Sequence, residues 1–257
     1  MIRHNVFLTL SFVFAVLFSS LTSAADYGHI HLTAPDTDAA ARWYAKHFDG
    51  EIGPGETTNR ATFGDILVVF YGREPTAGSV GSGVDHIGFS MPNVAEKMAV
   101  LVADGGTSLG DLIDFGGMTI GFVEDPWGTK IELIDDPELR GTHHIHLSTP
   151  NPEATLSWYA NAVGGEISKF KGQLDGLFYG DIWLLAAKAT APVAATEGRS
   201  IDHLGWNFSN LDEAAVALKH QGVHFSMEPR DYQSLRIAFI DAPDGVRVEL
   251  VQPPVAP

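Results

Sequence analysis

One pattern of segments occurs twice in this 257-residue sequence, and the repeat constrains the fold more than any other feature. The segment HIHLTAPDTDAAARWYAKHFDGEI, which begins at His29, recurs as HIHLSTPNPEATLSWYANAVGGEI at His144. Further along, VDHIGFSMPNV recurs as IDHLGWNFSNL, and DPWGTKIEL recurs as APDGVRVEL. A duplication of this length predicts two similar modules, which we place at residues 26–137 and 142–253.

Each module divides into two halves with the same order of predicted elements. The first half starts with an alternating strand, followed by Pro-Asp-Thr-Asp or Pro-Asn-Pro-Glu as a helix start and by an apolar-striped helix. The second half of the first module has a predicted strand at 85–91, a helix at 94–104 and hairpin strands at 118–124 and 129–135. We therefore predict an α+β fold of four βαβββ units that form two half-barrel modules.

Residues 1–25 have the composition of a cleavable secretory signal. Arg3 precedes an apolar run from Val6 to Phe18, and small residues from Ser19 to Ala25 follow it. The run is shorter than the roughly 20 residues of a membrane-spanning helix. We expect cleavage near Ala24 or Ala25 and a periplasmic or secreted protein that is not held at a membrane, with an uncleaved N-terminal anchor as the alternative.

Charge and cysteine content restrict the partners and the chemistry. The chain has 32 acidic and 16 basic residues, a net charge of −16, so we expect no binding to nucleic acid or to anionic membranes. It has no cysteine, so catalysis must use histidine, carboxylates, hydroxyls or a metal. Four units in one chain can complete the barrels without a partner, and we therefore expect a monomer acting on a small molecule.

Two histidines and one glutamate recur at matching positions and are the candidate metal ligands. His203 and Glu249 are separated by the same number of residues as His86 and Glu132. Side chains alternate along a strand, so each candidate lies opposite apolar neighbours that a helix could cover. A triad of this composition leaves positions open for substrate and accepts Fe, Mn, Zn, Ni or Co. We expect one triad in each module: His29, His86 and Glu132 in the first, and His144, His203 and Glu249 in the second.

A second histidine lies two residues after the first ligand in each module. Because His31 and His146 share a face with His29 and His144, we consider them candidate catalytic residues that could bind substrate, move a proton or replace a ligand. A structural or solvated role is the alternative for both. We interpret His143 as structural or surface-exposed.

Other residues around the triads receive simpler interpretations. Alternation predicts that Asp85 and Asp202 face away from the adjacent histidines, as residues that merely begin their strands. The glycines at Gly88 and Gly205 leave room beside the histidines. Arg60, like Lys171 and Arg236, is either a contact for an anionic substrate or a solvated charge.

The order of these segments resembles the vicinal-oxygen-chelate superfamily, which includes glyoxalase I, extradiol dioxygenases, fosfomycin-modifying enzymes and bleomycin-binding proteins. The similar segments are HIHLTAPD with RWYAKHF, VDHIGFSMP, and EDPWGTKIEL, and the resemblance covers both modules. It implies that paired units curl into half-open barrels with a divalent metal on the concave face. It also implies a substrate that chelates the metal through two neighbouring oxygens.

Two departures from that family leave the reaction type open. Glyoxalase I carries a further glutamate ligand in the last strand of the first half, where residues 65–71 and 181–187 offer apolar side chains. Extradiol enzymes carry a tyrosine ten residues before the final glutamate, where this chain has Phe122 and Phe239. The resemblance therefore implies a metal-dependent lyase, isomerase or dioxygenase, with a non-catalytic periplasmic binding or resistance protein as the alternative.

Overall fold

The computed structural model describes residues 25–254, so the predicted secretory signal lies almost wholly outside the described residues. The first repeat contains β1 (Asp26–Ala34), α1 (Thr37–Phe48), β2 (Arg60–Phe63), β3 (Ile66–Gly72), β4 (Val84–Ser90), α2 (Val94–Ala103), β5 (Thr107–Ser108), β6 (Ile113–Phe115), β7 (Met118–Glu124) and β8 (Lys130–Ile134). Both halves of the repeat therefore begin with a strand followed by a helix.

The second repeat follows the same order. It contains β9 (Gly141–Thr149), α3 (Pro152–Val163), β10 (Glu166–Phe170), β11 (Leu174–Phe178), β12 (Trp183–Lys188), β13 (Ile201–Asn207), α4 (Leu211–His220), β14 (Phe225–Tyr232), β15 (Leu235–Asp241), a short 3-10 turn (Pro243–Gly245) and β16 (Arg247–Gln252). The predicted α+β fold with two modules is confirmed. Within the described residues, no helix is both long and apolar enough to cross a membrane.

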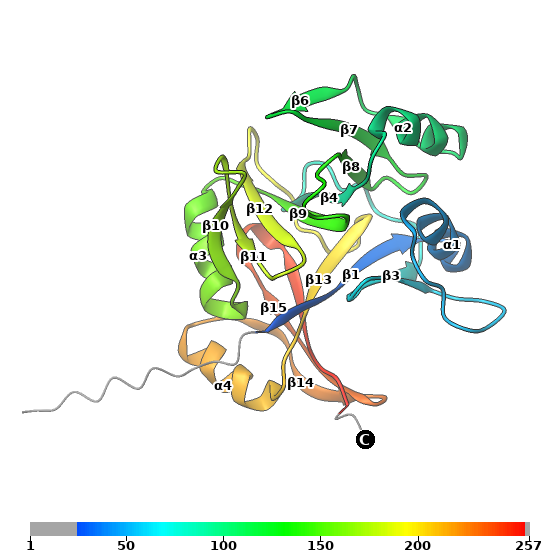
Figure 1. Ribbon diagram of the computed structural model, residues 1–257. Helices are drawn as coiled ribbons and strands as arrows, with labels where there is room; N and C mark the ends of the chain where they lie inside the picture. Colours follow the sequence, from blue (N-terminus) through cyan, green and yellow to red (C-terminus); the bar gives the residue numbers. More distant parts are fainter. Residues whose placement is uncertain (1–24, 255–257) are drawn as a thin grey trace, which may run out of the picture.

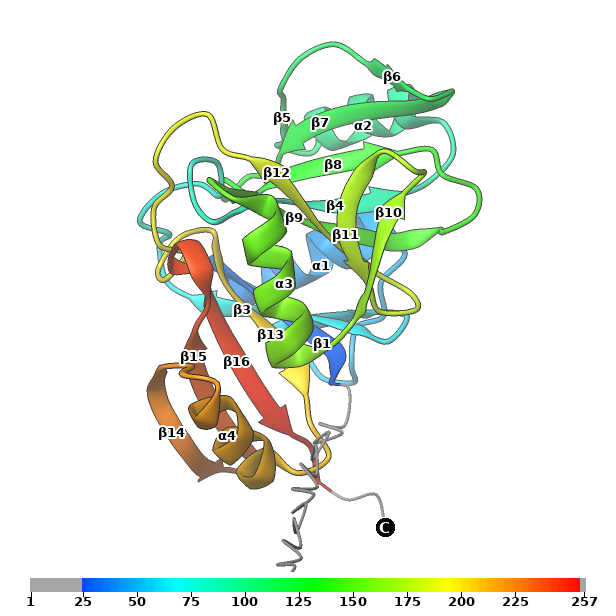
Figure 2. The same ribbon diagram turned by 90° about the vertical axis from the view of Figure 1, so that its left-hand side faces the viewer.

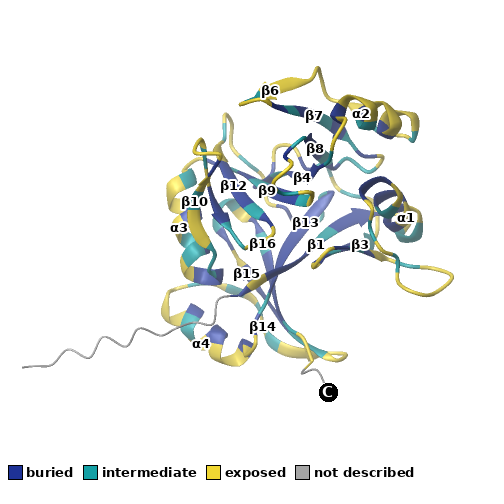
Figure 3. Cartoon of the chain, viewed as in Figure 1, coloured by how far each residue is buried: buried dark blue, intermediate teal, exposed yellow. Residues whose placement is uncertain are grey.

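Side-chain caps determine where three of the helices begin. Asp36 before α1, Asn151 before α3 and Asn210 before α4 each accept a hydrogen bond from the backbone N–H three residues ahead. Such caps satisfy donors that the first helical turn leaves free. The apolar stripe of α1, which includes Tyr44 and Phe48, is then buried in the main core. Figure 3 shows the same division, with buried strands and exposed outer helix faces.

The strands of residues 25–254 form two sheets, which we call the first and the second sheet. The first has the strand order β14-β15-β16-β13-β1-β3-β2. The second has the order β10-β11-β12-β9-β4-β8-β7-β5, with β6 paired to β7. Each sheet is curved (Figure 1).

The two sheets do not coincide with the two sequence repeats. At the centre of the first sheet, β1 of the first repeat pairs with β13 of the second repeat. At the centre of the second sheet, β4 of the first repeat pairs with β9 of the second. Each sheet therefore joins the first half of one repeat to the second half of the other. Figures 1 and 2 show α2 with β7 and β8 at one end of the molecule and α4 with β14 at the opposite end.

Candidate metal centres

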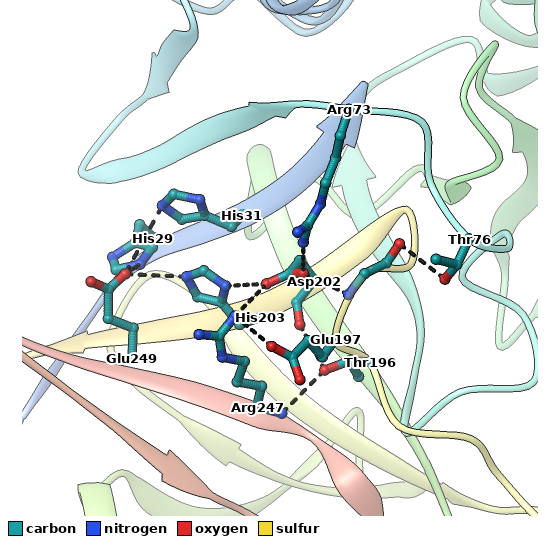
Figure 4. Close-up of polar contacts among 11 residues, drawn as sticks. His29, His31, Arg73, Thr76, Thr196, Glu197, Asp202, His203, Arg247 and Glu249 are labelled. Carbon is teal, nitrogen blue, oxygen red and sulfur yellow. Dashed lines mark hydrogen bonds and ion pairs between the residues drawn. The ribbon is translucent and has the colours of Figure 1, made fainter. Parts of the chain in front are cut away.

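Two groups of side chains within residues 25–254 bring four potential metal ligands together. In each group the four ligand atoms lie within 4.8 Å of one another. The first-sheet centre contains His29, His31, His203 and Glu249, which Figure 4 shows converging from β1, β13 and β16. The second-sheet centre contains His86, Glu132, His144 and His146.

The predicted grouping of ligands by repeat is wrong. All six predicted ligands belong to the two centres, but His29 lies with His203 and Glu249, and His144 lies with His86 and Glu132. The physical reason is the strand pairing, because β1 is hydrogen-bonded to β13 and not to β4. Each centre thus takes its first-strand histidines from one repeat and its other two members from the other repeat.

In both centres the histidine nitrogens surround the glutamate carboxylate. Oε2 of Glu249 lies 3.0 Å from Nε2 of His29 and 3.1 Å from Nε2 of His203. In the second-sheet centre, Oε2 of Glu132 lies 3.0 Å from Nε2 of His86 and 3.5 Å from Nε2 of His144. The repeated sequence therefore produces the same arrangement of atoms twice.

His31 and His146 supply a fourth potential donor in each centre. Nε2 of His31 lies 4.0 Å from the Glu249 carboxylate, and its ring stacks on that of His203 with centroids 4.2 Å apart. Nδ1 of His146 lies 3.1 Å from Nε2 of His86. The fourth donor therefore comes from β1 and β9, and not from β3 or β12.

The aspartate before one histidine of each centre holds that histidine in place; Asp202 is buried and Asp85 is half-buried. Nδ1 of His86 donates to Asp85 at 2.6 Å, and Nδ1 of His203 donates to Asp202 at 2.6 Å. This fixes the ring so that Nε2 faces the glutamate, as expected for a metal-binding imidazole backed by a carboxylate. Lys130 in turn contacts Asp85 at 2.7 Å.

The prediction that Asp85 and Asp202 face away from these histidines is wrong. The strand register is interrupted between Val84 and His86 on β4. It is also interrupted on β13, where Ile201 and His203 pair with the consecutive residues Leu32 and His31. These β-bulges place an extra residue, the aspartate, in the strand and break the alternation of side chains. The repeated Asp-His dipeptide was the sequence signal for this contact.

Two glycines make room for the histidine that comes from the other repeat. A Cβ atom on Gly205 would lie 1.9 Å from the His29 ring, and one on Gly88 would lie 2.2 Å from the His144 ring. Any side chain at either position would displace the ligand. The predicted space beside the histidines is therefore present, and it is filled by the imidazole of the neighbouring repeat.

His143 is buried beside the second-sheet centre. Its Nδ1 lies 2.7 Å from Nδ1 of His144, and its Nε2 lies 3.4 Å from Asp136. Burial, and secondarily the neighbouring His144, lowers the pKa of His143 to about 4. The neutral ring can accept the Nδ1–H of His144 while donating to Asp136, which leaves Nε2 of His144 free.

The protonation states largely match those that a divalent cation needs. Burial opposes ionisation of Glu249, but hydrogen bonds from His203 and His29 outweigh it and hold the pKa of the carboxyl below its ordinary value. Burial lowers the pKa of His29, which favours the neutral ring. His86 differs, because its hydrogen bonds to Asp85 and Glu132 overcome burial and raise its pKa, so metal binding would displace a proton there.

One unpartnered nitrogen also fits a metal. Nε2 of His144, which lies 3.5 Å from Oε2 of Glu132, is buried without a hydrogen-bond partner in the described part of the chain. Buried polar atoms are normally satisfied, so a lone-pair donor of this kind beside a carboxylate and two further imidazoles suits a metal ligand. The donor set suits Fe, Mn, Zn, Ni or Co.

Aromatic rings line both centres. Phe122 is directly opposite Glu132 in the strand register, and Phe239 is directly opposite Glu249. Tyr71, which the sequence reasoning missed, lies at the first-sheet centre with its ring centroid 4.5 Å from that of His31 and 5.7 Å from that of His203. Two-residue periodicity along the apolar strand 66–72 could have placed Tyr71 on this face.

Comparison with known proteins agrees with this architecture. A family model described as the Glyoxalase/Bleomycin resistance protein/Dioxygenase superfamily matches residues 26–133 and 141–250. Glyoxalase I from Zea mays is similar in structure, with a TM-score of 0.71 at 19% identity over 89% of this chain and 92% of that chain. A putative dioxygenase from Bacillus subtilis has a TM-score of 0.65 at 15% identity over 90% and 86% of the two chains. A search of curated protein sequences gave no match.

Proposed function

The chain belongs to the Glyoxalase/Bleomycin resistance protein/Dioxygenase superfamily, and from this premise we propose that it is a metal-dependent enzyme acting on a small molecule. In this proposal the substrate binds the metal through two neighbouring oxygens. The observation that carries it is the convergence of three imidazoles on one buried carboxylate in each sheet. When bound, a divalent metal supplies Lewis-acid activation of the substrate oxygens.

The residues of each centre have separate tasks in this proposal. His29, His203 and Glu249 hold one metal, and His144, His86 and Glu132 hold the other. Asp85 and Asp202 keep Nε2 of the adjacent histidine directed at the glutamate. His31 and His146 either complete the coordination or contact the substrate.

Two reaction types remain within the proposal. One is lyase or isomerase chemistry, and the other is oxygenase chemistry with iron. Oxygen uptake with catechols after ferrous loading, compared with isomerisation of hemithioacetals after nickel or zinc loading, separates them. Turnover in only one assay assigns the reaction type.

A non-catalytic periplasmic binding protein is the second candidate, and one observation favours it. Phe122 and Phe239 place apolar rings next to the glutamates, at the position where extradiol enzymes carry a tyrosine. If ligand binding survives alanine substitution of all six histidine and glutamate ligands, binding without metal catalysis is the better description.

Metal analysis of the purified protein tests the proposal. We expect two metal ions per chain after reconstitution, and almost none in the double variant His86→Ala with His203→Ala, which removes one ligand from each centre. His220→Ala, an exposed histidine at the end of α4, is the matched control. Metal content that is low in the wild type and unchanged in the double variant contradicts the proposal.

We also propose that the N-terminal segment directs export. Its support is the apolar run from Val6 to Phe18 followed by small residues. Expression in a bacterial host, followed by fractionation and N-terminal sequencing, should yield periplasmic protein that begins near Ala25 or Asp26. A full-length cytoplasmic product contradicts it.

A further inference from the structure

The two centres are copies in their ligands but differ in the residues that face them. The strand register gives the matching positions. In the first sheet Arg60 pairs with Val69, Val69 with His31, and His31 with His203. In the second sheet the same row contains Gly176, Leu185, His146 and His86. Directly paired residues share a face of the sheet, so Arg60 lies on the face of the first-sheet centre and Gly176 on that of the second.

The concave face of the second sheet is closed by apolar side chains. A buried hydrophobic cluster, separate from the main core, occupies this face and consists of Met118, Ile120, Ile134, Phe170 and Leu185, with Phe115, Phe122, Leu174 and Trp183 packed against it. Phe170 reaches across the concavity, because its ring lies 6.2 Å from that of Phe115 and 5.7 Å from that of Trp183. The ring of His143, which contacts the ligand His144, lies 5.0 Å from that of Phe170 in this cluster. The side chain of His144 is 2% exposed.

On β2 and β3 the first sheet carries smaller or polar residues at the matching positions, whereas Ile237, Phe239 and Val251 on β15 and β16 match the apolar Ile120, Phe122 and Ile134. Leu67 pairs with His29 where Trp183 pairs with His144, and Thr62 pairs with Leu67 where Phe178 pairs with Trp183. Tyr71 occupies the position of Ala187. The side chains of His31 and Glu249 in this centre are 12% and 11% exposed. His29 and Glu249 are more exposed than His144 and Glu132, but His203 is less exposed than His86. The first-sheet centre therefore faces a more polar surface on its β2–β3 side.

Arg60 is the positive charge available to a ligand on this surface. Arg73 and Arg247 lie nearby, but both are bound to the buried carboxylate of Asp202. Arg60 contacts the Asn59 side-chain oxygen at 3.2 Å, and among the described residues no carboxylate lies within 4 Å of it. Its strand is two strands from β1, roughly 10 Å away, which the arginine side chain can largely span.

The Tyr71 hydroxyl is the neutral donor on the same surface. A phenol with the ordinary tyrosine pKa of about 10 keeps its proton at neutral pH and can donate a hydrogen bond. Its ring rests against His31, which places it beside the candidate ligands. An arginine and a phenol near one metal centre suit a small anion that carries neighbouring oxygens.

We propose that substrate binds at the first-sheet centre, that it is a small anion of the 2-oxo or 2-hydroxy carboxylate class, and that Arg60 and Tyr71 contact it. The second-sheet centre holds its metal behind the apolar cluster and does not receive substrate. This inference rests on the proposed function, because it requires a metal in the first-sheet centre.

The test is a spectroscopic titration of the cobalt-loaded protein. The probe is 2-oxobutyrate, with the uncharged isostere 2,3-pentanedione for comparison. We expect 2-oxobutyrate to change the visible cobalt spectrum in the wild type and in His86→Ala, but not in His203→Ala. We also expect the Kd of 2-oxobutyrate to rise roughly tenfold in Arg60→Met and roughly fivefold in Tyr71→Phe. The larger effect belongs to Arg60, because its donor is charged while the phenol of Tyr71 is neutral.

Controls separate this inference from the proposed function. Cobalt stoichiometry and thermal stability should be unchanged in Arg60→Met, Tyr71→Phe and the control Lys169→Met, an exposed lysine on β10 of the second sheet. The inference is overturned, while metal binding stands, if the spectral response to 2-oxobutyrate is lost in His86→Ala but kept in His203→Ala. It is also overturned if the Kd is unchanged in both Arg60→Met and Tyr71→Phe. An equal response to 2,3-pentanedione overturns the anionic substrate class. Failure to bind cobalt removes the proposed function, and this inference with it.

Discussion

At the scale of single residues, each centre depends on side chains that lie outside its group of four candidate ligands. Asp85 and Asp202 each orient an imidazole through Nδ1. Lys130 binds Asp85, and Arg73 and Arg247 bind Asp202. Two glycines then permit the close approach of the other repeat's histidine. The ligand geometry is therefore set by contacts that a count of ligands alone would not show.

Removing the aspartate should weaken metal binding at one centre only. Asp85→Ala leaves Nδ1 of His86 without its acceptor, so the affinity of the second-sheet centre should fall roughly 10- to 100-fold. Competition with a chromophoric chelator, in a His203→Ala background that disables the other centre, measures this. Asp111→Ala, an exposed residue of the same repeat, is the control, and equal affinity in both variants would contradict the role of Asp85.

Adding a methyl group at Gly205 should disrupt the first-sheet centre. The new Cβ would lie 1.9 Å from the His29 ring, so the imidazole must move away from Glu249. We expect Gly205→Ala to lose one of two metal ions and roughly 1–3 kcal/mol of unfolding free energy. Gly53→Ala, which has open space around the added atom, should change neither quantity. Full metal content in Gly205→Ala would show that the close approach is unnecessary.

A buried carboxylate outside the centres makes stability depend on pH. Asp125 accepts hydrogen bonds from Tyr44 at 2.6 Å and from the backbone of Thr129 at 2.7 Å, and burial raises its pKa to about 6. The folded protein thus holds this proton more strongly than the unfolded chain, whose ordinary value is 3.8. The contribution of Asp125 to stability is present below pH 4 and is lost as pH rises to about 6.

The isosteric variant Asp125→Asn isolates this effect. Urea unfolding at pH values from 4 to 7 gives the free energy of unfolding of both proteins. The wild type should lose stability relative to the variant between pH 4 and 6, and the difference should be constant above that range. A difference that does not change with pH would exclude a raised pKa for Asp125.

At the scale of elements, periodicity predicted much of the secondary structure. The helix predicted at 94–104 is α2 (Val94–Ala103), and the strand predicted at 118–124 is β7 (Met118–Glu124). These segments are long and regular, so their patterns are clear. The pairing of β1 with β13 was not predictable, because apolar alternation shows which face of a strand is buried but not which strand lies beside it. The bulges at Asp85 and Asp202 each change the direction of the aspartate side chain alone. They do not alter the spacing of the apolar residues, so this spacing could not predict them.

An engineered disulfide tests the strand pairing. Asp26 on β1 is directly opposite Asn207 on β13, and the natural chain has no cysteine. Asp26→Cys with Asn207→Cys should therefore form a disulfide on mild oxidation, since paired residues have Cβ atoms roughly 4.5–5.5 Å apart. Asp26→Cys with Ser90→Cys, the matching position of the first repeat, should stay reduced. Peptide mapping by mass spectrometry distinguishes the two, and a bond in the second variant alone would contradict the observed sheet.

At the scale of the whole molecule, the exchange between repeats makes the two centres mutually dependent. Neither repeat contains all four candidate ligands of a centre, so each centre forms only when the two halves of the chain assemble. The resemblance to a known family predicted the types of candidate ligand from the sequence. Which of them come together depends on contacts between residues far apart in the chain, such as His29 and Glu249.

Metal counting in paired ligand variants tests this exchange most directly. His29→Ala with His203→Ala removes two ligands from the first-sheet centre, and the protein should keep one metal ion per chain. His29→Ala with His86→Ala removes one ligand from each centre, and the protein should keep almost none at a free metal concentration that just saturates the wild type. The opposite result, with one ion kept in the His29 and His86 pair and none in the His29 and His203 pair, would contradict the account, because it would mean that each repeat holds its own metal.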